Sequence, residues 1–137
     1  MRALALLLLI AVPAAAPAAP VPKELRKNGL DKFVGSWVQD PANGSTWKFE
    51  ADGTAAIHNG GAAPSGGIKY AIDSSADPMT LDWVASWGTW YGLCELKDDT
   101  FAIYLCRANG AAKIRPKALE AAAGVEIYRF KRAASAK

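Results

Sequence analysis

Residues 67–73 read Gly-Ile-Lys-Tyr-Ala-Ile-Asp, and their side chains alternate between apolar and polar. Ser74-Ser75-Ala76-Asp77-Pro78 then breaks the pattern with residues typical of turns. Three further runs with strand-like character follow, the last two facing each other across Asp98-Asp99: Met79–Val84, Trp90–Leu96 and Phe101–Leu105. A period of two with turn residues between the runs indicates half-buried antiparallel strands. This stretch therefore predicts an all-β domain.

The remainder of the chain supplies four more strands. They are expected at Phe33–Gln39, Thr46–Glu50, Thr54–His58 and Val125–Lys131. Eight short antiparallel strands either stack as a sandwich or close as an up-and-down barrel. We favour the eight-stranded antiparallel barrel because closure removes exposed sheet edges. Such a barrel has room for its own side chains or for one small ligand.

The first residues have the pattern of a secretory signal peptide. Met1-Arg2 carries a positive charge, and Ala3–Val12 is an unbroken apolar run. Residues 13–20 are all alanine or proline. The apolar run is shorter than the ~20 residues that a membrane anchor needs. We expect cleavage after Ala18 and export to the periplasm or the extracellular space.

Four parts of the chain follow from these patterns: a signal peptide at 1–18, an N-terminal segment at 19–32, the barrel domain at 33–132 and a tail at 133–137. Lys23-Glu24-Leu25-Arg26-Lys27 within the N-terminal segment predicts one or two helical turns.

The charge balance argues against a nucleic-acid partner. Without Arg2, the 16 basic residues become 15 against 13 acidic residues, and the formal net charge falls from +3 to +2. The region from Arg107 to Arg132 is nonetheless rich in lysine and arginine. It is either a solvated basic rim or a surface for an acidic partner.

The two cysteines, Cys94 and Cys106, are predicted to be free thiols. A tight turn at Asp98-Asp99 places Cys94 opposite Ile103 and Cys106 opposite Tyr91. The thiols then lie on opposite faces of the hairpin and about three positions out of register, whereas a disulfide needs Cα atoms within ~7 Å.

Catalytic or metal-binding residues are not expected. His58 is the sole histidine and ends a predicted strand, so we expect it to be exposed. Cys94 alternates with Gly92 and Leu96 on a presumed core face, where thiols are inert. Asp73, Asp77 and Asp82 lack the dense spacing of a calcium loop. We therefore predict no catalytic residue, no metal and no cofactor.

Four aromatic residues within a short span are the best candidates for binding: Trp83, Trp87, Trp90 and Tyr91. Gathered at one barrel mouth, they could stack on a sugar, a lipid or another planar ligand. The alternative is that Trp83 and Trp90 belong to the core and that Trp87 covers the rim.

Three stretches carry a family resemblance when taken in order. They are Gly67–Asp82, Gly92–Leu105 around Glu95-Leu96-Lys97-Asp98-Asp99-Thr100, and Arg115-Pro116 before the last strand. Together they resemble a family of small exported planctomycete-type domains of unknown function, described as lipocalin-like. The resemblance spans about residues 30–132 and implies a lipocalin-like barrel but no activity.

Gly35-Ser36-Trp37 is also similar to the Gly-x-Trp signature of the first lipocalin strand. The resemblance implies that Gly35 lets the strand bend and that the Trp37 indole plugs the closed end of the barrel. It further implies that an arginine of the last strand stacks on this indole, and Arg129 is the candidate. Arg115 is expected to have a structural role, and Asp82 is expected either to face solvent or to pair with Arg115.

These observations predict a monomeric, non-catalytic binding protein for a small apolar or amphipathic molecule. The alternative is a module with a side-chain-filled barrel that contacts an envelope protein or an envelope polymer. The volume left inside the barrel separates the two hypotheses, because a filled interior leaves only surface binding.

Overall fold

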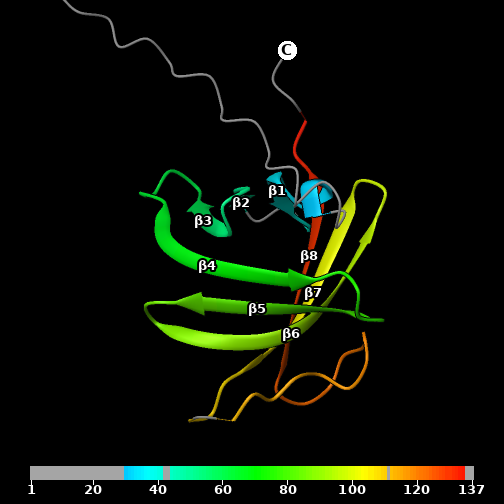
Figure 1. Cartoon of the computed structure of the whole chain (residues 1–137). Coiled ribbons are helices and arrows are strands. Elements are labelled where there is room, and N and C mark those ends of the chain that lie inside the picture. Colours follow the sequence, from blue (N-terminus) through cyan, green and yellow to red (C-terminus); the bar gives the residue numbers. More distant parts are fainter. Residues whose placement is uncertain (1–29, 42–43, 111, 135–137) are drawn as a thin grey trace, which may run out of the picture.

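Eight antiparallel strands close into a barrel in the computed structural model, which describes residues 30–41, 44–110 and 112–134 (Figure 1). The short 3-10 helix η1 (Leu30–Lys32) precedes them. The strands are β1 (Gly35–Gln39), β2 (Ser45–Phe49), β3 (Thr54–Asn59), β4 (Ser65–Asp73), β5 (Met79–Ala85), β6 (Gly88–Lys97), β7 (Thr100–Arg107) and β8 (Val125–Arg132). Each strand pairs with the next, and β8 returns to pair with β1. The predicted up-and-down barrel is confirmed.

Some of the predictions fall on parts of the chain that are not described. The signal peptide at 1–18 and the helical turns predicted near Lys23 lie outside the described residues. Within the described part of the chain, no helix is long and apolar enough to cross a membrane.

The β6–β7 hairpin has the register that the sequence predicts. Asp98 and Asp99 form a two-residue loop, and Asp98 has a φ of +52°, which aspartate tolerates better than most residues. Cys94 therefore pairs with Ile103, and Cys106 pairs with Tyr91. Both cysteines are free, as expected from their positions on opposite faces.

The β5–β6 connection is tighter than the sequence suggested. The predicted strands end at Val84 and begin again at Trp90, but Gly88 and Thr89 belong to β6 and pair with Ala85 and Val84. Continuing the ladder satisfies backbone groups that a longer loop would leave to solvent. Only Ser86 and Trp87 remain between the two strands.

The closed end of the barrel is built around Trp37. Its side chain is fully buried, and its indole Nε1 donates a hydrogen bond to the Phe33 carbonyl oxygen at 2.9 Å. The Arg132 guanidinium carbon lies 4.2 Å from the centroid of the indole. Gly35, with a φ of +127°, leaves room for that guanidinium, because a Cβ here would lie 3.4 Å from Arg132 Nη1.

The prediction that Arg129 stacks on Trp37 is wrong. Trp37 is in register with Arg132, which faces the interior together with Phe130. Side chains alternate along a strand, so Arg129 must face the outside of the barrel. Arg132 also donates to the carbonyl oxygens of Lys32 at 2.6 Å and Val34 at 3.4 Å.

Replacing Arg132 by alanine is expected to lower the free energy of unfolding by about 1–2 kcal/mol, through the lost stacking and hydrogen bonds. Replacing Arg129 by alanine is expected to change it by less than about 0.5 kcal/mol, as exposed positions usually do. Urea unfolding of both variants checks this, and equal losses would contradict the assignment of Arg132.

Aromatic side chains fill the closed half of the interior. Phe101 lies 5.4 Å from Trp37, 5.6 Å from Phe49 and 5.9 Å from Phe130 between ring centroids. All four rings are almost completely buried. Because these rings are in contact and protein interiors pack at crystal-like density, a ligand has to bind nearer the other end of the barrel or on its outer wall.

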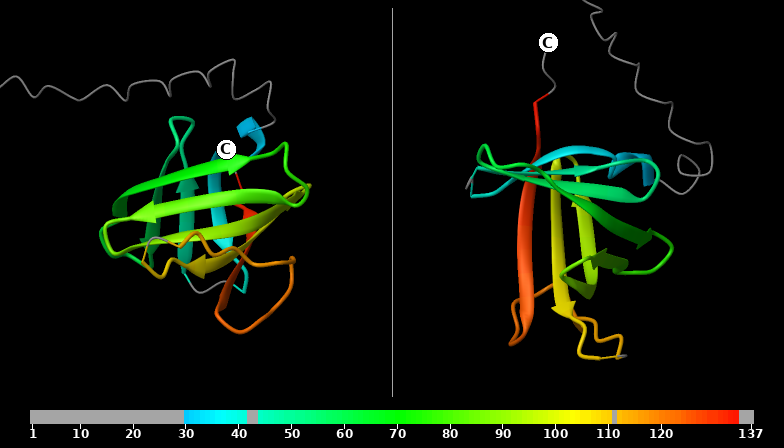
Figure 2. Two further views of the ribbon diagram at one scale, coloured as in Figure 1. Left: turned by 60° about the horizontal axis from the view of Figure 1, so that its bottom comes forward. Right: turned by 90° about the vertical axis from the view of Figure 1, so that its left-hand side faces the viewer.

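The long connection 108–124 crosses the outside of β5 and β6 (Figure 2). Arg115 holds it there by donating to the carbonyl oxygens of Leu81 at 3.1 Å and Gly92 at 3.0 Å. Arg115 also forms an ion pair with Asp82, so of the two alternatives for Asp82 the structure has the pairing with Arg115.

Candidate functional site

The end of the barrel opposite Trp37 is called the mouth here. In an up-and-down barrel, alternate connections meet at the same end, so the β1–β2, β3–β4, β5–β6 and β7–β8 connections all meet here. Five residues at this end make up what we call the mouth cluster: Trp87, Trp90, Arg107, Glu126 and Tyr128. They come from the β5–β6 turn and from strands β6, β7 and β8.

Glu126 is an acidic residue on the inward-facing side of β8. It alternates with Tyr128 and Phe130, and Phe130 is in the core. Its Oε1 accepts a hydrogen bond from Trp90 Nε1 at 3.2 Å, and its Oε2 accepts one from the Tyr128 hydroxyl at 2.8 Å. These two donors orient the carboxylate. Each oxygen has a second acceptor position left for a ligand.

Tyr128 is held in its neutral form. Burial, the hydrogen bond to Glu126 and the charge of that carboxylate raise the pKa of Tyr128 to about 12. The phenol therefore remains a hydrogen-bond donor to Glu126 at physiological pH.

Arg107 supplies a positive charge on the other side of Trp90. Its guanidinium carbon lies 5.5 Å from the Trp90 ring centroid, and its Nη2 donates to the Trp87 carbonyl oxygen at 3.1 Å. Trp90 thus has an oriented guanidinium on its face and an oriented carboxylate at its indole nitrogen. Cation–aromatic contacts of this kind are favourable by about 0.5–2 kcal/mol.

A chain of tilted aromatic ring contacts continues from the mouth cluster toward the core. The Trp47 ring centroid lies 5.0 Å from those of both Tyr128 and Trp83. Trp47 Nε1 donates to Ser45 Oγ at 3.2 Å, and Ser45 Oγ donates to Asn59 Oδ1 at 2.9 Å. Among the described residues, every buried side-chain nitrogen and oxygen has a partner. The polar groups at the base of the mouth are therefore paired within the protein.

The four residues predicted for binding are separated by the fold. Trp83 and Trp90 pair across β5 and β6 and face the interior, with 3 % and 8 % of their surfaces exposed. Trp87 is 47 % exposed in the β5–β6 turn. Tyr91 faces the outer wall instead, where the Arg115 guanidinium carbon and Lys113 Nζ lie 5.5 Å and 5.4 Å from its ring centroid. Three of the four residues are thus at or beneath the mouth.

Arg107, Glu126 and Tyr128 were missed in the sequence. The signals were present, because the register around Asp98-Asp99 places Arg107 opposite Trp90. A period of two counted back from Phe130 places Tyr128 and Glu126 on the inner face of β8.

Other candidate residues have positions that fit structural roles. His58 is exposed on β3. Burial raises the pKa of the Cys94 thiol to about 12, which keeps it protonated and unreactive. Asp73 Oδ1 accepts hydrogen bonds from the Ser75 backbone and hydroxyl at 2.9 and 2.6 Å, which caps the β4–β5 turn. Across the described ranges, no three His, Cys, Asp or Glu residues are grouped as a metal site.

The fold and the mouth cluster define a small all-antiparallel β-barrel whose mouth is aromatic and carries one charge of each sign. No protein-family model matches the chain, and neither the curated proteins nor the solved structures contain a match. The resemblance to the lipocalin-like planctomycete-type domains stays a prediction.

Proposed function

We propose that this protein is a non-catalytic binding protein that holds a small amphipathic molecule at the mouth of the barrel. The observation that carries the proposal is the arrangement around Trp90, where an aromatic ring lies between the carboxylate of Glu126 and the guanidinium of Arg107. An apolar or planar part of a ligand would contact Trp87 and the aromatic rings beneath it. A polar head group would pair with Glu126 or Arg107.

An amphipathic ligand is favoured over a purely apolar one by the cost of desolvation. Covering Glu126 and Arg107 with hydrocarbon would remove two charged groups from water without replacing their hydrogen bonds. A ligand with a polar head group compensates that loss. The filled closed half of the barrel limits such a ligand to the mouth.

The proposal includes export and a monomeric state, which rest on the leader pattern of residues 1–18 and on barrel closure. The second candidate function is contact with an envelope protein or polymer. It is favoured by three large apolar side chains that are exposed on the described surface: Val84, Trp87 and Ile114.

The binding proposal can be tested by titrating the protein with dodecylamine and 1-anilinonaphthalene-8-sulfonate while following tryptophan and dye fluorescence. Trp87→Ala, Arg107→Ala and Glu126→Gln are each expected to weaken binding of at least one probe about tenfold, or 1.4 kcal/mol. The Arg107 bond to residue 87 survives in Trp87→Ala, because the acceptor is a backbone oxygen. Its stability should therefore stay within about 0.5 kcal/mol of the parent.

The matched control is Ile114→Ala, which removes an equally exposed apolar side chain away from the mouth cluster. It should leave binding of both probes unchanged. Equal effects of Ile114→Ala and the mouth variants would reject the mouth as the site. Native mass spectrometry of the protein isolated from its own envelope then identifies any retained molecule.

A further inference from the structure

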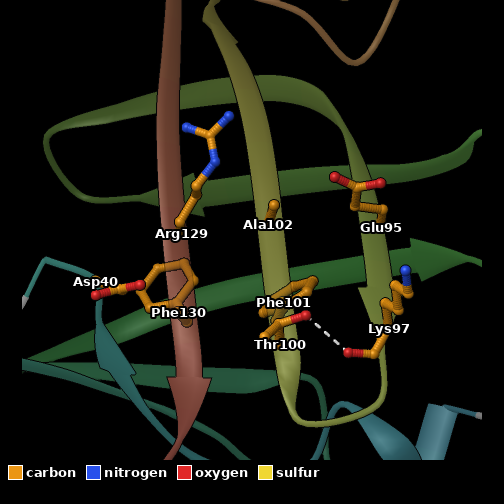
Figure 3. A pocket seen from close by; sticks show the side chains of 8 residues that line it. All are labelled: Asp40, Glu95, Lys97, Thr100, Phe101, Ala102, Arg129 and Phe130. Carbon is orange, nitrogen blue, oxygen red and sulfur yellow. Dashed lines mark hydrogen bonds between the residues drawn. The ribbon is translucent and has the colours of Figure 1, made fainter.

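A depression on the outer wall has a floor made by the smallest side chain of a row that runs across three strands. Glu95 on β6, Ala102 on β7 and Arg129 on β8 lie directly opposite one another across the three strands (Figure 3). All three face outward, because their neighbours Cys94, Phe101 and Phe130 fill the core. The hollow over Ala102 has a volume of about 280 Å³.

The two charged residues that flank the hollow do not pair with each other. Within the described residues, the Arg129 guanidinium makes no ion pair or hydrogen bond. Asp40 lies beside Arg129, with its backbone N–H donating to the Arg129 carbonyl oxygen at 2.7 Å, but its carboxylate pairs with Lys131 at 3.1 Å. The Glu95 carboxylate accepts one long hydrogen bond, from the Tyr104 hydroxyl at 3.4 Å.

The floor between the charges is apolar and closely packed. Ala102 is only 7 % exposed although it faces outward. A polar or larger residue at this position would fill the hollow and reach the two charged groups. The site therefore presents a free cation and a largely free carboxylate on opposite sides of an apolar base.

We propose that this hollow binds a small zwitterion of the amino-acid class. The ligand's carboxylate would form a bidentate ion pair with the guanidinium of Arg129, and its ammonium group would form an ion pair with the Glu95 carboxylate. The Cα atoms of Glu95 and Arg129 are two strand spacings apart, roughly 10 Å. The hollow of about 280 Å³ that their side chains flank has room for a ligand of amino-acid size.

Lys97 provides the means to distinguish a zwitterion site from a simple anion site. It lies two residues from Glu95 on the same face of β6, and its side chain runs along that strand toward Glu95 (Figure 3). In a zwitterion site, Lys97 competes with the ligand's ammonium group for Glu95. In an anion site, Lys97 and Arg129 would act together.

The experiment is an NMR titration of the ¹⁵N-labelled protein with glycine and β-alanine, compared with acetate and methylamine. A ligand this small supports only weak binding, so titrations extend to concentrations of about 10 mM and beyond. At least one zwitterion should shift the amide signals of β6–β8 and bind at least tenfold more tightly than acetate or methylamine. Arg129→Ala and Glu95→Gln should each weaken this binding at least tenfold, while Lys97→Ala should not weaken it.

Lys69→Ala and Glu120→Gln are the matched controls, because both residues are exposed and lie outside this hollow. They should bind the zwitterion like the parent. Acetate binding as tightly as the zwitterion, together with a loss in Lys97→Ala, would overturn the proposal in favour of an anion site. Absence of shifts with either zwitterion would also overturn it. Because the residues differ from the mouth cluster, neither result affects the proposed amphipathic site.

Discussion

The Gly92→Ala variant is expected to lose about 3 kcal/mol or more of its free energy of unfolding, because overpacking of this kind costs typically about 1–3 kcal/mol and occasionally more. A Cβ at position 92 would lie 2.3 Å from the Tyr104 carbonyl oxygen and 2.6 Å from Leu105 Cδ2. The first of these atoms belongs to the β6–β7 ladder and cannot move without disturbing the hydrogen bonds between the strands. Gly92 also provides a carbonyl oxygen to Arg115, so a shift here would loosen the connection over β5 and β6.

Urea unfolding followed by tryptophan fluorescence measures the loss. Gly66→Ala is the matched control, because a Cβ at Gly66 meets nothing within 4 Å and the residue lacks a positive φ. It should unfold within about 0.5 kcal/mol of the parent. If Gly92→Ala were as stable as this control, the close packing of β6 against β7 at Tyr104 would be wrong.

Alkaline pH is expected to destabilise the protein well before its arginines titrate. Burial raises the pKa of Cys94 from 9.0 to about 12. Below pH 9 the thiol is protonated in both the folded and the unfolded chain, and its contribution to stability is complete. Between pH 9 and 12 the unfolded chain loses this proton while the folded chain keeps it, so the free energy of unfolding falls by about 1.4 kcal/mol per pH unit.

Two tyrosines should steepen this decline at higher pH. The pKa values of Tyr70 and Tyr128 are both raised from 10.0 to about 12, mainly by burial. Their contribution is also present at lower pH and is lost as the pH rises from 10 to 12. Chemical unfolding at a series of pH values between 8 and 11 should therefore show a slope that is negative from pH 9 and steeper above pH 10.

Cys94→Ala separates the thiol from the tyrosines. This variant should be less stable at neutral pH, because it leaves a small cavity, but its stability should fall less steeply between pH 9 and 10. Cys106→Ala controls for removal of a thiol from the outer face of the same hairpin. Parallel slopes for the parent and Cys94→Ala would refute the assignment of the slope to the buried thiol.

The local sequence pattern was sufficient to predict where the strands lie and that they form a barrel. Alternating side chains and turn residues located all eight strands to within two or three residues, because each strand has one face in the core. The tight turn at Asp98-Asp99 was sufficient to predict the β6–β7 register and that Cys94 and Cys106 lie too far apart to form a disulfide. A two-residue loop leaves no freedom in counting pairs across a hairpin.

Contacts across longer connections were decided by the tertiary structure alone. The segment 108–124 separates β7 from β8, so counting along the chain could not show whether Arg129 or Arg132 lies opposite Trp37. For the same reason, the sequence could not show that Glu126 reaches Trp90 or that Arg129 lies beside Ala102. The β6–β7 register already pairs Arg107 with Trp90 and Glu95 with Ala102. By itself, the sequence determined which residues form strands and which way most of their side chains face. Barrel closure determined which of those side chains meet, because a long connection leaves the register to packing and to the pairing of β8 with β1.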